Sequence, residues 1–268
     1  MSHTFGQDRA SAPFWEEETA RYQQQMRESR AAYHDARLET ARRLLDRAEL
    51  PTGSRIVDFG CGEGAFAWEL ADAGHTVHGT DIAEAMIAIA SDGPPAGATF
   101  EVGTARDLAA AGPCDALVTL NTLAYLTADE MGAFWDAART IVRPGGWLLV
   151  SHSNELFDVF ALNDGTAAFY ARHFDADVAS LLTAGAEERP SYNVRANPLS
   201  YPDELRREGF TETARAFFNF HPKPPALLGA YPDDGRIVDP DAIAAVEPWK
   251  QMLQCSTYFS LSQRASAQ

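Results

Sequence analysis

Apolar side chains recur along the chain in two different rhythms. Across residues 14–49 they return at the spacing of a helix, as Tyr33, Leu38 and Leu45 illustrate, and this pattern predicts a helical N-terminus. The pattern stops at residues 51–53, where a Pro-Thr-Gly sequence disfavours a continued helix. Beyond this point short apolar runs alternate with amphipathic stretches, which indicates strands separated by helices.

The alternation of strands and helices predicts the fold class. Five strands are expected at residues 55–59, 76–80, 98–102, 114–120 and 147–151, with helices at 64–73, 83–90 and 128–141 between them, and two more strands at 212–220 and 254–262. Strands that alternate with helices pair in parallel through right-handed crossovers. We therefore expect an α/β fold with a doubly wound, mostly parallel sheet of seven strands.

The regular alternation breaks after the fifth strand and divides the chain into four segments. Residues 1–50 are expected to form a helical cap, 51–154 the α/β core, 155–205 an insertion, and 206–268 the last two strands with a proline-rich loop between them. A stretch as long as 155–205 exceeds an ordinary connection, so we interpret it as a lid over a binding site. Its aromatic residues either line a ligand pocket or pack the lid itself.

Composition and charge exclude several classes of protein. Hydrophobic residues make up 46% of the 268, enough for a packed core, and no apolar run approaches the ~20 residues of a membrane-spanning helix. The net charge of −16 and the lack of a Lys/Arg cluster disfavour a nucleic-acid partner. The polar N-terminus does not resemble a signal peptide, which indicates a cytoplasmic protein.

The spacing of the cysteines gives no sign of a metal site. Cys61, Cys114 and Cys255 lie far apart in the sequence and form no CxxC pair. Neither a zinc site nor a disulfide framework is therefore expected.

A glycine-rich loop follows the first predicted strand and marks a cofactor site. Gly60, Gly62 and Gly64 allow a tight turn and a close approach of a ligand, and the next helix offers N–H groups to an anion. A dinucleotide pyrophosphate and the methionine end of S-adenosylmethionine (SAM) both suit such a loop. Asp58, two residues before the first glycine, would repel a pyrophosphate but suits a ligand with an ammonium and a sulfonium. The sequence therefore favours SAM.

The glycine loop and the residues that end the next strands resemble the class I SAM-dependent methyltransferases. The resemblance covers about residues 50–155 and implies a Rossmann-like methyltransferase fold. Asp81 matches the acidic residue that holds both ribose hydroxyls in this family, and Ile82 is expected to pack on the adenine. Asn121 matches the residue beside the methionine and the reacting methyl group. Asp81 also precedes a predicted helix, where the alternative role is an N-cap.

The resemblance implies a full set of SAM-binding residues. This chain has Thr104 where the family often has an acidic residue that contacts adenine, so that wall of the pocket is assigned to Ala105 and Arg106. The implied cofactor residues are Asp58, Gly60, Cys61, Gly62, Gly64, Asp81, Ile82, Ala105, Arg106 and Asn121.

The methyl acceptor is expected above the carboxyl ends of the strands, where ligands bind in open sheets. The catalytic candidates there are His152, His221 and Tyr125. His152 follows the fifth strand, and an ordinary histidine pKa of about 6.5 suits a base near neutrality; the alternative is a structural histidine at a strand end. His221 ends a predicted strand and opens the proline-rich loop.

The resemblance implies an enzyme that transfers a methyl group to an O or N atom of a small metabolite, in secondary-metabolite or sugar biosynthesis. The acidic composition gives weak support to a cationic acceptor. Two alternatives use the same loop: an NAD(P)-dependent oxidoreductase and a non-catalytic SAM-binding protein. The sequence makes no prediction of an oligomeric state.

Overall fold

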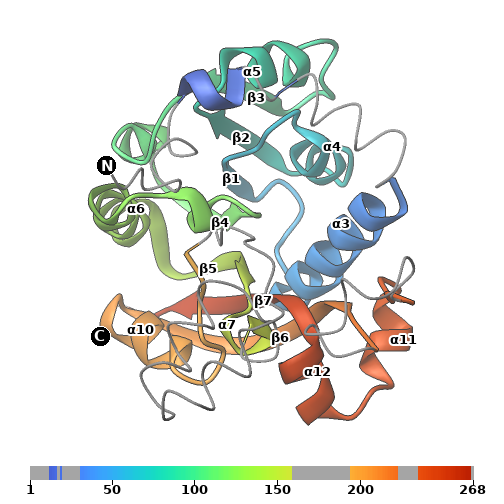
Figure 1. The fold of residues 1–268 in the computed structure, drawn as a ribbon. Helices are drawn as coiled ribbons and strands as arrows, with labels where there is room; N and C mark the ends of the chain where they lie inside the picture. Colours follow the sequence, from blue (N-terminus) through green and yellow to red (C-terminus); the bar gives the residue numbers. More distant parts are fainter. Residues whose placement is uncertain (1–11, 17–18, 20–30, 159–193, 223–234, 267–268) are drawn as a thin grey trace, which may run out of the picture.

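Seven strands form one sheet in the computed structural model, in the order β3-β2-β1-β4-β5-β7-β6 (Figure 1). The structure describes residues 12–16, 19, 31–158, 194–222 and 235–266. The strands are β1 (Arg55–Phe59), β2 (Thr76–Asp81), β3 (Ala98–Val102), β4 (Cys114–Thr119), β5 (Val142–Ser153), β6 (Phe210–Phe220) and β7 (Cys255–Arg264). The first five pair in parallel, whereas β7 runs antiparallel to both of its neighbours. The predicted fold class is therefore confirmed.

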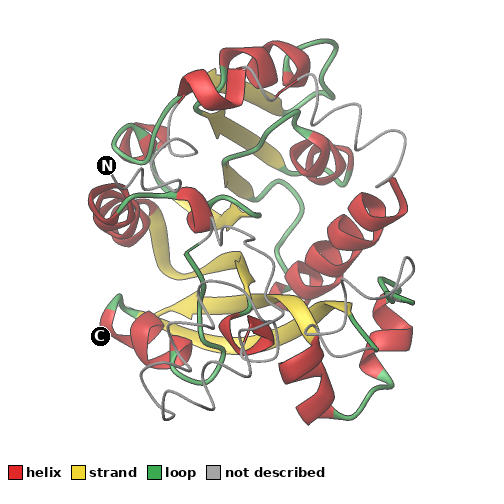
Figure 2. Cartoon of the chain, viewed as in Figure 1, coloured by secondary structure: helices red, strands yellow, loops and turns green. Residues whose placement is uncertain are grey.

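Helices cover both faces of the sheet (Figure 2). They are α3 (Ala31–Leu45), α4 (Ala65–Asp72), α5 (Glu84–Ala90), α6 (Ala128–Ile141), α7 (Glu155–Asp158), α10 (Tyr201–Arg207), α11 (Pro240–Ala244) and α12 (Pro248–Gln254), with 3-10 turns η1 (Asp46–Ala48), η2 (Leu108–Ala111) and η3 (Leu123–Tyr125). In Figure 1, α3 and α4 lie on one side of the sheet, and α6 and α10 lie on the other.

The core has two halves because neighbouring residues of a strand point to opposite faces. Ile56 and Leu149 pack with α3 and α4, whereas Val57 and Leu148 pack with α6 and α10. All four are fully buried. Burial on both faces explains why these strands appear in the sequence as unbroken apolar runs.

Several element boundaries differ from their predictions. β5 begins at Val142 rather than at residue 147, because Val142 already pairs with Cys114. α4 begins at Ala65, one residue late, because Gly64 has a φ of 82°. Most of the predicted lid lies outside the described residues, as does Tyr22 of the predicted N-terminal helix. The division into four segments stays a prediction.

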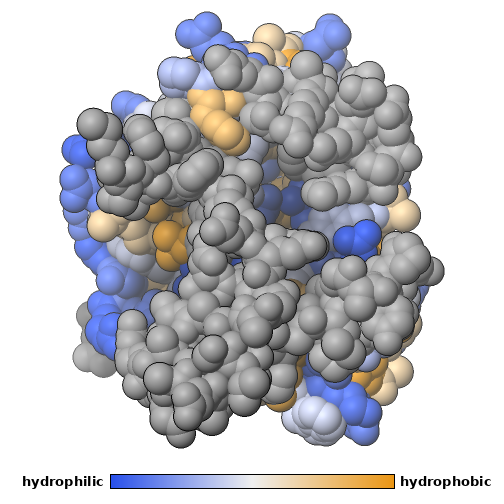
Figure 3. Space-filling view, in the orientation of Figure 1, coloured by the Kyte–Doolittle hydropathy of each residue, from blue (hydrophilic) through white to orange (hydrophobic). Residues whose placement is uncertain are grey.

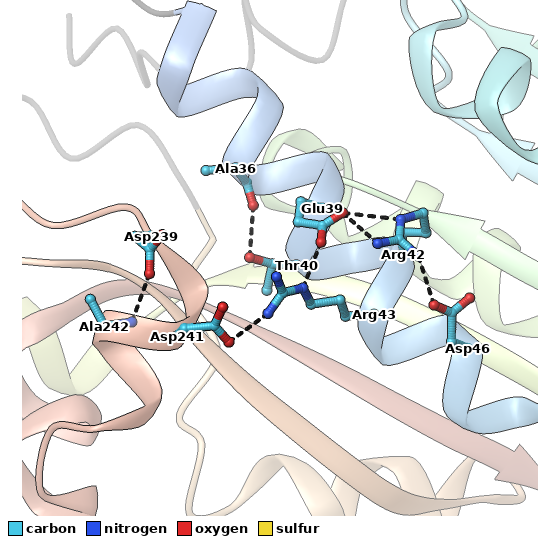
Figure 4. A network of polar contacts seen from close by, with 9 residues as sticks. All are labelled: Ala36, Glu39, Thr40, Arg42, Arg43, Asp46, Asp239, Asp241 and Ala242. Atoms are coloured by element: carbon cyan, nitrogen blue, oxygen red, sulfur yellow. Dashed lines mark hydrogen bonds and ion pairs between the residues drawn. The ribbon is translucent and has the colours of Figure 1, made fainter.

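A polar network fixes α3 against the C-terminal part of the chain (Figure 4). Glu39 accepts hydrogen bonds from Arg42 and Arg43, and Arg43 also pairs with Asp241 of α11 at 2.7 Å. Exposed ion pairs of this kind each contribute only about 0–1 kcal/mol. Their role is to set the position of α3, whose N-terminal half reaches the carboxyl edge of the sheet.

The described surface is predominantly hydrophilic at the left edge, the top and the bottom of the view in Figure 3. Among the described helices, none combines the length and the apolar character that a membrane crossing requires.

Candidate functional site

A cavity opens where β1, β2 and β4 end. Eight of the ten predicted cofactor residues line this cavity. They are Asp58, Gly60, Cys61, Gly62, Asp81, Ile82, Ala105 and Asn121. Gly64 and Arg106 lie outside the lining: Gly64 precedes α4, and Arg106 is exposed. Tyr125 of η3 also lines the cavity, so the structure brings this catalytic candidate to the cofactor residues.

The loop after β1 needs glycine because its backbone is left-handed. Gly60 and Gly62 have φ angles of 73° and 54°, a region that other residues rarely adopt. The N–H groups of Gly60 and Cys61 both donate to the carbonyl of Thr80, at 2.7 and 3.0 Å. The loop is thereby held against the end of β2, which places it beside Asp81.

Replacing Gly60 tests how tightly the loop is packed. A Cβ on Gly60 would lie 2.0 Å from Oγ1 of Thr122, whereas a Cβ on Gly62 meets nothing within 4 Å. We expect Gly60→Ala to lower the free energy of unfolding by about 2–4 kcal/mol and Gly62→Ala by about 1–2 kcal/mol. Urea unfolding of the cofactor-free protein measures both, and equal losses would contradict the packing seen around Gly60.

Asp81 connects the glycine loop to the start of α5. Its Oδ2 accepts from the N–H of Gly62 at 2.9 Å, and its Oδ1 accepts from the N–H of Ala83 at 3.0 Å. Burial raises the pKa of this carboxyl group. A carboxylate has about four acceptor positions, so each oxygen can still accept from a ligand hydroxyl. The N-cap of α5 is Ala83, without a side-chain cap hydrogen bond, so the alternative capping role of Asp81 is wrong, and its ribose role stays a prediction.

Asp58 is a buried carboxylate that faces the cavity. Its side chain is 2% exposed, and no described residue hydrogen-bonds its oxygens. Burial and, to a smaller extent, the nearby Asp81 raise the pKa of Asp58 to about 7, against the opposing effect of Arg37. A cation bound beside this buried carboxyl group would stabilise its charged form.

Two cavity residues, His34 and Arg37, were missed by the sequence analysis. Both belong to α3, and Nη2 of Arg37 lies 3.1 Å from Nδ1 of His34. Since that nitrogen accepts from Arg37, Nε2 carries the proton of the neutral ring. Nε2 of His34 and Nε of Arg37 are buried without a hydrogen-bond partner. Their sequence signal was weak: two polar positions, three residues apart, near the start of an otherwise apolar helix face.

Two described N-terminal residues, Trp15 and Glu16, contact the cavity and the start of α5. Trp15 lines the cavity and meets Tyr125 edge to face, with ring centroids 5.3 Å apart. Glu16 accepts hydrogen bonds from the N–H groups of Glu84 and Ala85 at the start of α5. The predicted helical cap therefore reaches the site, through residues that the sequence analysis did not single out.

His152 lies outside the cavity lining and is buried, with 7% of its surface exposed. Its ring contacts the rings of Tyr201 and Tyr258, at centroid distances of 4.1 and 4.9 Å. Burial and, to a smaller extent, the positive charge of Arg215 lower the pKa of His152 to about 3. The expectation of an ordinary pKa near neutrality is therefore wrong for this histidine, because the protonated form loses its hydration.

His221 also lies outside the cavity lining and follows the last residue of β6. Nδ2 of Asn219 lies 3.1 Å from Nε2 of His221, and the ring contacts Phe157 at 4.9 Å. Asn219 has a left-handed φ of 59°. The structure thus places His221 in a polar cluster at the carboxyl end of β6, separate from the cofactor residues.

No described group of three or more His, Cys, Asp or Glu side chains could hold a metal ion. All three cysteines are free.

Comparisons with known proteins match the central part of the chain. Residues 56–146 match the model of a methyltransferase domain family. A ubiquinone biosynthesis O-methyltransferase of Xanthomonas axonopodis pv. citri (strain 306) is 30% identical over 53% of this chain and 59% of the relative. One of the same description from Azorhizobium caulinodans is 35% identical over 41% of this chain and 44% of the relative. The chain therefore spans about half the length of these relatives.

A solved structure shares the fold. The magnesium protoporphyrin IX methyltransferase of Synechocystis PCC 6803, with bound S-adenosylhomocysteine (SAH), superimposes with a TM-score of 0.52. The two sequences are 17% identical, and the match covers 88% of this chain and 85% of the other.

Proposed function

Because residues 56–146 match a methyltransferase domain family, we propose that this chain is a class I SAM-dependent methyltransferase that transfers the methyl group of SAM to an oxygen atom of a small molecule. The match over residues 56–146 supports the family predicted from the sequence. The cofactor residues and the acceptor are parts of the proposal.

The charges of the cavity carry the proposal. The amino-acid end of SAM has an ammonium and a carboxylate. Asp58 offers a buried carboxylate to the first, and Nε of Arg37 with Nε2–H of His34 offers donors to the second. All three side chains line one cavity and have unused hydrogen-bonding capacity there. The residues of this chain therefore fit the cofactor.

The nucleoside end of SAM fits the opposite wall. Asp81 retains free acceptor positions for two ribose hydroxyls, and Ile82 and Ala105 give the cavity an apolar wall for adenine. A dinucleotide could use the same wall. Its pyrophosphate, however, would lie at the glycine loop, between the carboxylates of Asp58 and Asp81, where like charges repel. This favours SAM over a nicotinamide cofactor.

Bound SAM supplies a methyl group that its sulfonium has already activated. The chain then has to align the acceptor and exclude water, which is chiefly a matter of positioning. Trp15 and Tyr125 contact each other at the cavity and shield it. Asn121 lies at the same wall, held by a hydrogen bond from its N–H to Oγ of Ser151 at 2.7 Å.

An oxygen acceptor is supported by the relatives, which are described as O-methyltransferases. Nitrogen stays the alternative acceptor atom. The role in secondary-metabolite or sugar biosynthesis stays a prediction, as do the catalytic roles of His152, His221 and Tyr125. A non-catalytic SAM-binding protein is the second candidate, since the cavity residues explain binding without the transfer step.

Transfer from SAM with a radiolabelled methyl group tests the proposal. The purified protein is incubated with labelled SAM and a protein-free extract of small molecules, and the label is followed into new compounds. We expect labelled products with the native protein and none with Asp81→Ala. Native protein that binds SAM and yields no labelled product would support the non-catalytic alternative instead.

A further inference from the structure

A carboxylate of the cofactor cavity, that of Glu130 in α6, has no part in the proposed function. Glu130 lines the same cavity as Ile82 and Ala105, the two residues proposed to face the adenine of SAM. Asp58 and Asp81, the carboxylates that the proposed function uses, belong to the ends of β1 and β2. Glu130 therefore brings an acidic group to the cavity from a different element.

Glu130 lies on the face of α6 that packs against the adenine side of the cavity. Phe134, four residues later, is fully buried in the core half that also contains Ala105 and Leu108. Residues four apart lie on the same face of a helix, and α6 packs against η2, which begins at Leu108. The first turn of α6 thus places Glu130 next to the turn that holds Ala105.

The capping box of α6 fixes the side chain of Glu130 and leaves one of its oxygens unused. Oε2 accepts from the N–H of Thr127 at 2.9 Å and from its hydroxyl at 2.7 Å. The N–H of Glu130 donates in return to Oγ1 of Thr127 at 3.3 Å. Oε1 accepts a hydrogen bond from none of the described residues. A carboxylate oxygen in a fixed position is therefore available to a ligand.

The turn after β3 offers the cavity no carboxylate of its own. Thr104 donates its N–H and its hydroxyl to Oδ2 of Asp107, at 2.9 and 2.7 Å, and its hydroxyl accepts from the N–H of Arg106 at 3.3 Å. Asp107 and Arg106 are exposed and lie outside the cavity lining. The side-chain hydrogen bonds of this turn are therefore made within the turn itself.

The amino group of adenine needs a hydrogen-bond acceptor beside the apolar wall of the cavity. Without one, its burial would lose the hydrogen bonds that it makes to water, and a carboxylate is a strong acceptor. We propose that Oε1 of Glu130 accepts a hydrogen bond from the 6-amino group of the adenine of SAM. Glu130 would thereby determine the specificity for a 6-amino purine over a 6-oxo purine. This proposal rests on the proposed function, because it adds a contact to the same cofactor.

A change of one group in the ligand and one in the protein tests this contact. The ligands are SAH and S-inosylhomocysteine, its deaminated analogue, which has an oxygen in place of the 6-amino group. Both are titrated calorimetrically into the native protein, Glu130→Gln and Asp129→Asn. Asp129 is the matched control, since it lies in the same first turn of α6 but is exposed and outside the cavity lining.

We expect the native protein and Asp129→Asn to bind SAH about 10- to 100-fold more tightly than S-inosylhomocysteine, because the 6-oxo group would meet a carboxylate. Glutamine also completes a capping box. With its amide oxygen at the cap, Glu130→Gln presents an NH2 group to the base. This variant should bind SAH about 10-fold more weakly and S-inosylhomocysteine about 10-fold more tightly than the native protein does.

The melting temperature (Tm) of the free proteins checks the structural role of Glu130. We expect both variants to melt within about 2 °C of the native protein, because the capping box is kept. A native protein that binds both ligands equally would overturn the proposed contact. So would a Glu130→Gln variant that keeps the native preference or weakens both ligands by the same factor. A native protein that binds neither ligand contradicts the proposed function itself, so the two failures are distinguishable.

Discussion

Replacing Asp81 by alanine is expected to weaken SAM binding by about 100-fold or more. The substitution removes the acceptor of the Gly62 and Ala83 N–H groups and the proposed partner of two ribose hydroxyls. Hydrogen bonds to a charged group each contribute about 1.5–3 kcal/mol, so two lost ligand contacts account for this factor. Isothermal titration calorimetry with SAM measures the change.

A matched control variant distinguishes the loss of the Asp81 contacts from the loss of one negative charge. Asp92→Ala removes the same charge from the exposed turn after α5, and we expect it to leave SAM affinity unchanged. Circular dichroism checks that Asp81→Ala is folded, since Asp81 also joins the loop to α5. Native affinity in a folded Asp81→Ala protein would remove the ribose assignment.

Replacing Asp58 by asparagine is expected to lower SAM affinity at pH 8 by about 10-fold or more, and to remove most of its pH dependence below pH 8. With the pKa of Asp58 near 7 in the free protein, an ammonium has to compete with a proton for this carboxylate. The native protein should therefore bind SAM more weakly as the pH falls from 8 to 6.

The same pKa predicts the effect of Asp58 on stability. A carboxyl group whose pKa is raised by folding favours the folded state at low pH, and that contribution is lost as the pH rises through the folded pKa. The free native protein should thus lose stability between about pH 4 and pH 7 through this group. Asp58→Asn should lack this loss and melt at a higher temperature than the native protein at pH 8.

Calorimetric titrations at pH 6, 7 and 8, together with Tm measurements of the free proteins, check both parts of the Asp58 prediction. Equal pH profiles in the native protein and in Asp58→Asn would show that another group controls the affinity.

The strands and the glycine loop were predictable from the sequence, because each is formed by a local pattern of residues. Asp58 and the glycine loop lie at the end of β1, Asp81 is the last residue of β2, and parallel strands end at the same edge of a sheet. Their meeting in one cavity therefore follows from the order of the elements. The boundary of β5 was less predictable because Arg143-Pro144-Gly145 suggests a turn, while the pairing of Val142 with Cys114 extends the strand.

The remaining site residues depend on how distant segments pack. His34 and Arg37 reach the cavity because α3 crosses the sheet and packs against β6, with Tyr33 on Phe218. No local pattern encodes that contact. The lowered pKa of His152 could not be predicted from the local sequence either. Tyr201 and Tyr258, which bury this histidine, come from segments some 50 and 100 residues further along the chain.

A calorimetric titration of the native protein with SAM and, separately, with NADH tests the central claim most directly. We expect one SAM bound per chain and no detectable heat from NADH, because the two carboxylates at the glycine loop favour a cationic ligand and repel a pyrophosphate. Binding of NADH without binding of SAM would contradict it.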